Sequence, residues 1–254
     1  MTSEINHIIA VDGKFSDVSK IAKIFAKKNN IEALAPLHDK LEGKATLAYE
    51  QFEECPEATM FVQTIAGGYG IVGYLMGHKR LQSLGIKKDN KTPKIVAVQI
   101  EGSDTIKKAM TNGLESLTKE DLMISETPFE KTLQSTNPLK TYEVVRDSIN
   151  ATDGIIESVS IKEVEENKEL FEKELGALNI DVCYQNEKSP FISFAGLIKL
   201  AKKGLIDKKD KIYFVLTGMG KTGKRSVKPD AILKPTEDGY VVVENNLEAK
   251  GIQL

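Results

Sequence analysis

The sequence lacks tryptophan, holds only two cysteines and three histidines, and carries no excess of either charge. Its 35 Lys and Arg residues nearly cancel its 37 Asp and Glu residues, which leaves a net charge of −2. A chain without a basic field has little attraction for a nucleic-acid backbone. Cys55 and Cys183 are far apart and match no CxxC or Cys/His spacing. We therefore expect buried structural thiols and no metal site.

Long apolar runs are missing as well. No stretch reaches the roughly 18 apolar residues that a membrane span needs. The first residues have neither a basic segment nor the apolar core of a secretion signal. We expect a soluble, cytoplasmic protein whose partner is a small molecule or another protein. Its 254 residues suffice for one large or two modest domains with an apolar core.

The sequence does contain a regular alternation of short apolar runs and helical patterns. This alternation predicts an α/β fold with a mostly parallel sheet and helices on both faces. Expected strands lie at 7–11, 59–65, 94–100, 155–159, 180–184 and 211–217, with a possible hairpin around 237–239. Expected helices lie at 17–28, 44–52, 71–84, 104–112, 139–150, 161–175 and 189–203, the sixth opened by a capping box of Ser160 and Glu163. The stretch 114–138 is expected to be rich in loops.

One glycine loop, AGGYG at residues 66–70, stands between an expected strand and an expected helix. Glycines let a backbone approach a ligand closely, successive N–H groups form a nest for anions, and the helix begins with its positive end. The loop therefore suits a phosphate group. Two other interpretations stay open. Gly68, Gly70 and Gly73 satisfy the dinucleotide pattern GxGxxG, with Glu101 as the ribose-binding acid, and a tight strand-to-helix turn needs no ligand at all.

A second glycine-rich segment, GMGKTGK at 218–224, fits the P-loop pattern GxxxxGK. Arg225 stands where a Mg²⁺-binding Ser or Thr belongs, and no amphipathic helix follows. This segment is therefore a poor nucleotide site.

Six separated segments resemble, in the same order, the threonine synthases, which are pyridoxal-phosphate enzymes of fold type II. GKFSD at 13–17 resembles the family turn GxFDD, and LEGKATLAYE at 41–50 is similar to LEGQKTLAFE. QTIAGGYG at 63–70, which includes the glycine loop, resembles QxVSGGxG. TNP at 136–138 resembles a GNP turn, GIIESVS at 154–160 resembles a strand before a capped helix, and VLTGMG at 215–220 resembles TxTGHG.

The resemblance implies pyridoxal 5′-phosphate as the cofactor. Its phosphate is expected on the backbone N–H groups of Gly67, Gly68, Tyr69 and Gly70. Thr217 is expected to hydrogen-bond the pyridine nitrogen, and the alternative for Thr217 is a plain buried threonine. The implied fold is the large domain of fold type II enzymes at 31–228, with a remnant of the smaller domain at 1–30 and a tail or hairpin at 229–254.

Two family motifs do not occur in this sequence. The lysine that forms a Schiff base lies in an SxKDR segment, and an SGNTG loop contacts the cofactor; neither is present. A nucleophilic lysine needs desolvation or a nearby cation. The lysines here stand on expected solvated faces or helix ends, so no catalytic residue is predicted. EKSPFIS at 187–193 echoes the family segment EPASAAS, and its Pro190 and Phe191 would crowd the cofactor ring.

The resemblance thus implies a threonine-synthase-like protein, the C-terminal part of a lyase of threonine biosynthesis. It would convert O-phosphohomoserine to threonine when another chain supplies the N-terminal part; a homodimer is the other assembly considered. The alternatives are a truncated pyridoxal-phosphate-binding or regulatory protein without catalysis, and an NAD-dependent enzyme. No nucleic acid or membrane is expected as a partner.

Overall fold

A computed structural model of the chain describes residues 7–13, 15–32, 37–89, 91–123, 125, 129–133, 138–180, 184, 187–217 and 228–247. The chain divides into two compact units. The larger unit is Pro36–Thr222, and the smaller one combines Met1–Ala35 with Gly223–Leu254. No helix in these described stretches combines the length and apolarity that a membrane crossing requires.

The larger unit is built around a four-stranded parallel sheet. Its strands are β2 (Met60–Thr64), β3 (Lys94–Ile100), β4 (Ile155–Val159) and β5 (Ile212–Phe214), in the order β4-β3-β2-β5. All three strand pairs are parallel. The central strands β2 and β3 are buried almost throughout, as expected of near-continuous apolar runs in a parallel sheet.

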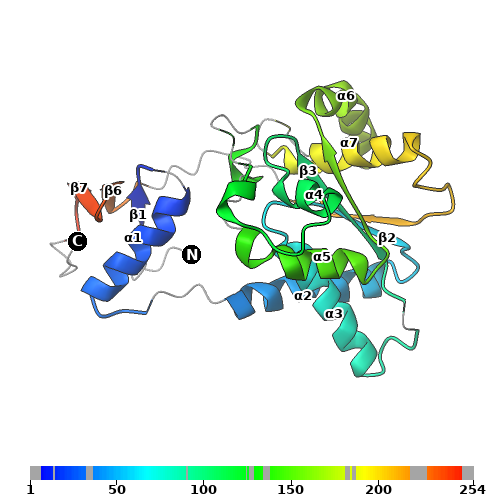
Figure 1. Cartoon of the computed structure of the whole chain (residues 1–254), viewed down its shortest axis with the longest axis horizontal. Helices are drawn as coiled ribbons and strands as arrows, with labels where there is room; N and C mark the ends of the chain where they lie inside the picture. Colours follow the sequence, from blue (N-terminus) through cyan, green and yellow to red (C-terminus); the bar gives the residue numbers. More distant parts are fainter. Residues whose placement is uncertain are drawn as a thin grey trace. The chain divides into compact units, whose positions relative to one another are not determined.

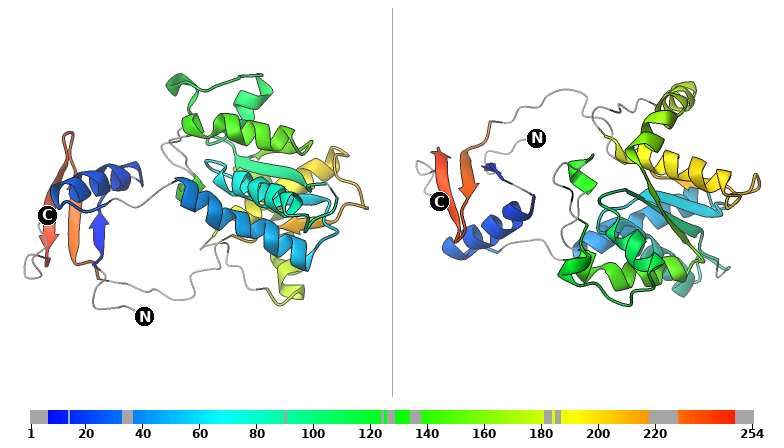
Figure 2. Two further views of the ribbon diagram at one scale, coloured as in Figure 1. Left: turned by 90° about the horizontal axis from the view of Figure 1, so that it is seen from below. Right: turned by 45° about the horizontal axis from the view of Figure 1, so that its top comes forward.

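Helices cover both faces of this sheet (Figures 1 and 2). The helices α6 (Ile161–Ala177) and α7 (Ser189–Lys202) cover one face. The helices α2 (Leu37–Glu54), α3 (Tyr69–Ser83), α4 (Thr105–Thr111) and α5 (Tyr142–Asn150) cover the other. The region predicted to be loop-rich carries short 3₁₀ turns at Lys119–Asp121 and Lys131–Leu133, and Pro138–Lys140 precedes α5. The predicted α/β class with helices on both faces is confirmed.

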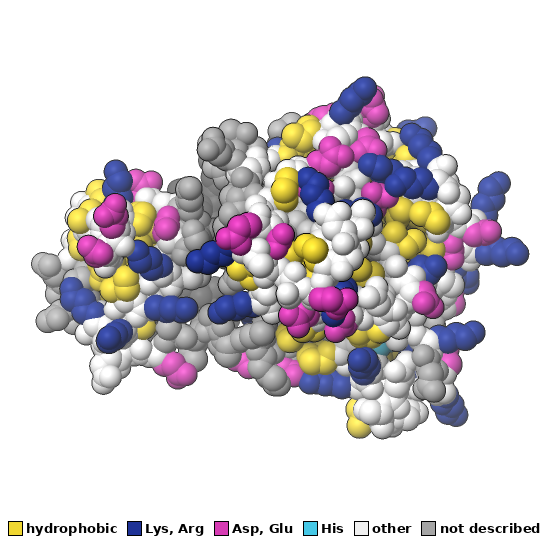
Figure 3. Space-filling view, viewed as in Figure 1, with side chains coloured by type: hydrophobic (Ala, Val, Ile, Leu, Met, Phe, Trp, Pro, Cys, Tyr) yellow, Lys and Arg dark blue, Asp and Glu magenta, His cyan; other side chains and the backbone are white. Residues whose placement is uncertain are grey.

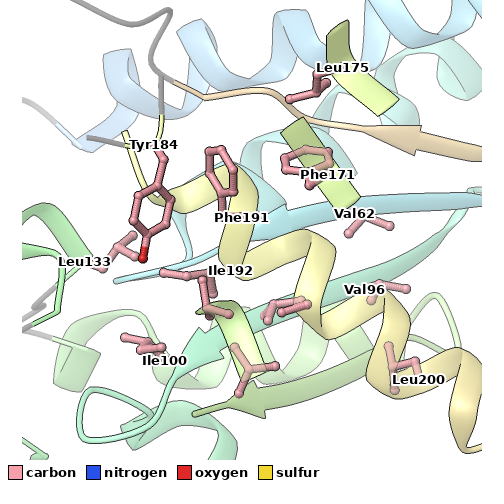
Figure 4. Close-up of a cluster of buried hydrophobic side chains, with 14 of the residues drawn as sticks. Val62, Val96, Ile100, Leu133, Phe171, Leu175, Tyr184, Phe191, Ile192 and Leu200 are labelled. Carbon is pink, nitrogen blue, oxygen red and sulfur yellow. The ribbon is translucent and has the colours of Figure 1, made fainter. Parts of the chain in front are cut away.

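The core between the sheet and α7 is made of aliphatic and aromatic side chains (Figure 4). Val62 and Val96 of the sheet pack in one cluster with Ile192 and Leu200 of α7. Phe191 lies edge-on to Phe171 of α6, with ring centroids 5.1 Å apart. On the opposite face Phe61 of β2 stacks on Tyr74 of α3 at 3.7 Å between centroids. The two clusters account for the alternation of side chains along β2.

Most elements lie where they were predicted, but several boundaries differ: α5 begins at Tyr142 and not at 139, and β5 ends at Phe214 and not at 217. The capping box of Ser160 and Glu163 opens α6 as predicted. The start of α2 at Lys44 is wrong by seven residues, because the helix begins at Leu37 and runs through Gly43. The strand predicted at 180–184 is not confirmed at its ends. The N–H of Ile180 bonds the Leu175 carbonyl oxygen at 2.9 Å in the turn that closes α6, and 181–183 lie outside the described residues.

The smaller unit contains a three-stranded sheet and one helix. The strands β1 (Ile9–Val11), β6 (Ala231–Pro235) and β7 (Tyr240–Asn245) lie in the order β1-β6-β7, and α1 (Phe15–Lys28) follows β1. β6 and β7 form the predicted antiparallel hairpin. β1 pairs with β6 in parallel, so segments from the two ends of the sequence share one sheet.

Charged side chains of both signs are interspersed on the face shown in Figure 3. This mixture agrees with the nearly balanced charge of the sequence. Cys55 is half-buried and free, whereas Cys183 lies outside the described residues.

Candidate functional site

The glycine loop joins the carboxyl end of β2 to the first turn of α3. Gly68 is the N-cap residue of α3 and has a left-handed backbone, with φ 79° and ψ 4°. Its carbonyl oxygen accepts the Val72 N–H at 3.3 Å. The N–H groups of the first helical turn, beginning at Tyr69, have no partner within the helix, and the helix dipole makes this end positive. The loop therefore presents backbone donors in the way that anion sites do.

Thr217 reaches the same edge of the sheet from β5. β5 pairs with β2 through Met60 and Ile212 and through Val62 and Phe214. The ladder goes on beyond β5, because the Val215 N–H bonds the Val62 carbonyl oxygen at 3.0 Å. Counted on from that bond, Thr217 comes level with Ile65, one residue before the glycine loop, although the paired strand itself ends at Phe214. Two segments about 150 residues apart, both predicted to touch the cofactor, are thus neighbours.

The hydroxyl of Thr217 is buried and lacks a hydrogen-bond partner among the described residues. A buried hydroxyl without a partner is unfavourable and calls for an explanation, such as a ligand that supplies the partner. This orphaned oxygen is the main observation that fits a bound group beside the loop.

The order of the strands also indicates a ligand site at the carboxyl ends of β2 and β5. β3 and β4 follow β2 on one side of the sheet, whereas β5 lies on the other side. The direction of strand succession therefore reverses between β2 and β5. Ligands of open α/β sheets bind at the carboxyl ends of the strands on either side of such a reversal.

Helix α5 holds the loop from one side. The Thr141 hydroxyl donates to the Gly67 carbonyl oxygen at 2.7 Å in a buried position. A Cβ atom added to Gly68 would lie 2.3 Å from a methyl group of Val145, so glycine is required there by packing and by φ. Neither Thr141 nor Val145 was singled out by the sequence. Both lay inside the helix expected at 139–150, and the structure begins that helix at Tyr142, which leaves Thr141 at its N-cap position.

The last two residues of β2 hold the loop region on opposite faces of the sheet. Thr64 donates to the Ser189 carbonyl oxygen at 2.6 Å and contacts the Ser193 hydroxyl at 2.5 Å, both in α7. Gln63 packs under Gly70, where an added Cβ would lie 2.2 Å from the Gln63 Oε1 atom. That Oε1 atom is buried without a hydrogen-bond partner among the described residues.

Gly73, the third glycine of the GxGxxG pattern, has a packing role. A Cβ added to Gly73 would lie 2.4 Å from the Cβ of Lys44 and 2.9 Å from the carbonyl oxygen of Leu41, both in α2. The glycine therefore permits the close approach of α3 to α2 and needs no nucleotide to explain it. Glu101 is exposed just after β3, beside Lys107 and Lys108 of α4.

The structure describes Phe191 but not two other predicted features of the site. Phe191 is 1% exposed and points into the core, where it lies edge-on to Tyr184 at 4.8 Å between centroids. The start of α7 turns that side chain toward α6, and the expectation that Pro190 and Phe191 crowd the cofactor ring stays a prediction. The second glycine segment at 218–224 and residues 136–137 lie outside the described residues.

Lys87 is the one buried lysine in the described part of the chain, and it lies far from the loop. Its amine pairs with the Asp89 carboxylate at 2.8 Å. Lys87 follows the carboxyl end of α3, whereas the loop precedes the amino end, and a helix of 15 residues is about 22 Å long. The described residues thus bring no desolvated lysine to the glycine loop.

Comparison with known proteins agrees with the motifs. No family model matches the chain. The threonine synthase of Methanocaldococcus jannaschii is 25% identical over 238 residues, which cover 91% of this chain and 53% of that protein. The threonine synthase of Methanosarcina acetivorans is 25% identical over 215 residues, 83% of this chain and 50% of that protein. This chain is related in sequence to the threonine synthases.

Solved structures show the same fold. Maize serine racemase superimposes with a TM-score of 0.58 at 18% identity, over 79% of this chain and 56% of that one. Threonine synthase from Escherichia coli gives a TM-score of 0.56 at 15% identity, over 84% of this chain and 47% of that one. These likenesses show that the chain has the fold of fold type II enzymes. The chain spans about half the length of the curated relatives it matches.

Proposed function

We propose that this chain binds pyridoxal 5′-phosphate at the carboxyl ends of β2 and β5. The phosphate would lie on the backbone N–H groups of Gly67, Gly68, Tyr69 and Gly70. The hydroxyl of Thr217 would donate to the pyridine nitrogen. The observation that carries the proposal is the buried Thr217 hydroxyl, which has no partner among the described residues and follows the strand that pairs with β2, next to a loop of backbone donors.

The residues present fit this group chemically. A dianionic phosphate suits successive N–H groups at the positive end of a helix. The cofactor supplies an electron sink for carbanion chemistry at the substrate. A neutral hydroxyl at the pyridine nitrogen donates a hydrogen bond without giving up its proton, unlike a carboxylic acid partner. With Thr217 as its partner, the cofactor would therefore be a weaker electron sink than with a carboxylic acid partner.

The reaction that we propose is that of a threonine synthase, from O-phosphohomoserine to threonine. Two curated relatives carry that name, and they are about twice as long as the matched region. The SxKDR and SGNTG motifs do not occur in this sequence. We therefore propose that the amine that anchors the cofactor comes from a second chain bearing those motifs, with a homodimer as the other assembly to be tested.

Titration of the purified chain with pyridoxal 5′-phosphate, followed by absorbance, tests the cofactor. We expect saturable binding, and Thr217→Val should weaken it about tenfold through loss of one hydrogen bond. The same variant should leave the stability of the free protein unchanged or higher, because the described part of the chain gives the Thr217 hydroxyl no partner. Thr111→Val, at an exposed position of α4, is the control and should bind like the wild type.

Two results would contradict this proposal, the first for the cofactor and the second for the role of Thr217. One is protection against unfolding by NADH and not by pyridoxal 5′-phosphate, which would favour the dinucleotide interpretation. The other is equal affinity of the cofactor for the wild type and Thr217→Val, which would place the ring elsewhere.

A non-catalytic cofactor-binding or regulatory protein is the second candidate. The distance of Lys87 from the loop favours it for the chain in isolation. Borohydride reduction of the cofactor-loaded chain distinguishes the two. Only the binding role would remain under two conditions. Borohydride would never fix the cofactor covalently, and no complex recovered in a native pull-down would form threonine from O-phosphohomoserine.

A further inference from the structure

The side chain of Thr141 stands at the N-cap position of α5 and yet does not cap that helix. An N-cap threonine normally accepts a hydrogen bond from an N–H of the first turn of its own helix. Here no such bond is formed. The hydroxyl instead donates to the Gly67 carbonyl oxygen at 2.7 Å, with a longer contact of 3.4 Å to the Pro138 carbonyl oxygen. Thr141 is 4% exposed, so the bond to the loop is shielded from water.

This bond determines the orientation of one peptide group of the loop. A trans peptide is planar, and its C=O and N–H point in opposite directions. Anchoring the Gly67 carbonyl on Thr141 therefore turns the Gly68 N–H away from α5. The orientation of the peptide between Gly68 and Tyr69 is fixed in a similar way, because the Gly68 carbonyl oxygen accepts the Val72 N–H inside α3. The Tyr69 N–H then points out of the amino end of the helix.

The same helix also prevents the loop from relaxing. Val145, one turn after Thr141, fills the space next to the Gly68 Cα. Gly68 is buried and has a left-handed backbone, so its peptide groups have little freedom to reorient. The Thr141 bond and the Val145 contact thus preset the Gly68 N–H, and the Gly68–Val72 bond inside α3 presets the Tyr69 N–H, before any ligand arrives. Preset donors bind an anion more strongly than donors that must first be ordered.

We infer that Thr141 is a positioning residue for the phosphate of the cofactor, acting through the Gly67–Gly68 peptide and not by contact with the ligand. The inference rests on the proposed function, since it assigns to Thr141 the orientation of the donors that the cofactor would use.

The test compares two buried threonines at opposite ends of α5. Thr152 is 8% exposed, its hydroxyl accepts the Ile95 N–H at 3.2 Å, and it lies at the carboxyl end of the helix. Thr141→Val and Thr152→Val each remove one buried hydroxyl and keep the side-chain shape. Urea unfolding of the free proteins should show a similar loss of stability in both. Titration with pyridoxal 5′-phosphate, and with inorganic phosphate in competition, gives the affinities.

We expect Thr141→Val to lose about tenfold in affinity for both ligands and Thr152→Val to lose none. Thr141→Ser keeps the donor and should bind within about twofold of the wild type, which also guards against a folding defect. Equal affinities for Thr141→Val and Thr152→Val would overturn the inference while leaving the cofactor assignment intact. A wild type that binds neither ligand would overturn the cofactor assignment, and the inference with it.

Discussion

Gly68 illustrates why a glycine in a candidate binding loop needs to be interpreted at the level of single atoms. Its φ of 79° excludes most side chains, and a Cβ atom would overlap Val145. The protein itself imposes both requirements for glycine, so neither of them is evidence of a ligand. The evidence for binding lies in the neighbouring N–H groups and in the Thr217 hydroxyl, for which the described stretches supply no partner.

His78 in α3 is a second residue whose surroundings have a measurable consequence. Its ring is fully buried, lies edge-on to Tyr74 at 4.6 Å between centroids, and has both nitrogens without partners among the described residues. Burial is the main factor that lowers the pKa of His78 from 6.5 to about 4. The positive charge of Lys87 lowers it further, and Asp89 partly opposes this effect.

This burial predicts a loss of stability in mild acid. Between pH 6.5 and about 4 the unfolded chain takes up a proton on this histidine that the folded chain does not. The folded state is therefore fully favoured above pH 6.5 and loses up to about 3 kcal/mol as the pH falls toward 4. Urea unfolding at pH 7 and pH 4.5 measures the change. His78→Phe should remove this part of the pH dependence, and an identical pH dependence in both proteins would show that His78 does not cause it.

At the scale of elements, the contact between α2 and α3 is made by small residues. Gly77 of α3 faces the backbone of α2, where an added Cβ would lie 2.5 Å from the Ala45 carbonyl oxygen and 2.7 Å from the Ala48 Cβ. Gly73, one turn earlier in α3, permits the same close approach of the two helices. This packing orients the helix whose amino end carries the glycine loop.

Gly77→Ala should therefore destabilise the protein by about 2 kcal/mol, because the backbone of α2 must move. Gly43→Ala, in the middle of α2 where nothing lies within 4 Å, is the matched control and should stabilise it by about 0.5–1 kcal/mol through helix propensity. Denaturant unfolding measures both. Similar effects of the two substitutions would contradict the packing that we describe.

At the scale of the whole molecule, the smaller unit has an exposed strand at one edge of its sheet. β7 pairs with β6 on one side, and the order of the sheet places no described strand on its other side. Val241, Val242 and Val243 are 51%, 43% and 60% exposed. Exposed apolar edge strands invite pairing with other chains.

Val241→Glu should therefore reduce association of the chain at high concentration, as measured by light scattering. Glutamate at 241 would also face Lys234, the residue opposite it on β6. Val144→Glu is the control, since Val144 is equally exposed at 51% but stands on helix α5, which has no open hydrogen-bonding edge. Equal effects of the two substitutions would mean that apolar exposure and not the strand edge drives association.

The elements that were predicted best are those with a strong local signal. The strands at 94–100 and 155–159 agree to the residue, because continuous apolar runs have one stable placement in a parallel sheet. The start of α2 was missed because its early turns are fixed by packing that neighbouring residues do not signal, since Leu41 and Lys44 lie against Gly73 of α3. The direction of the Phe191 ring likewise depends on how α7 packs against α6, which no local pattern indicates.

The sequence by itself determined the α/β class, the position of a loop suited to phosphate, and the relation to threonine synthases, since all three rest on local patterns and on motifs in order. Only the tertiary structure decided that β5 lies beside β2, that the buried Thr217 hydroxyl has no partner among the residues described, and that Thr141 holds Gly67 across 74 residues. Such contacts depend on the packing of distant segments, for which neighbouring residues carry no signal.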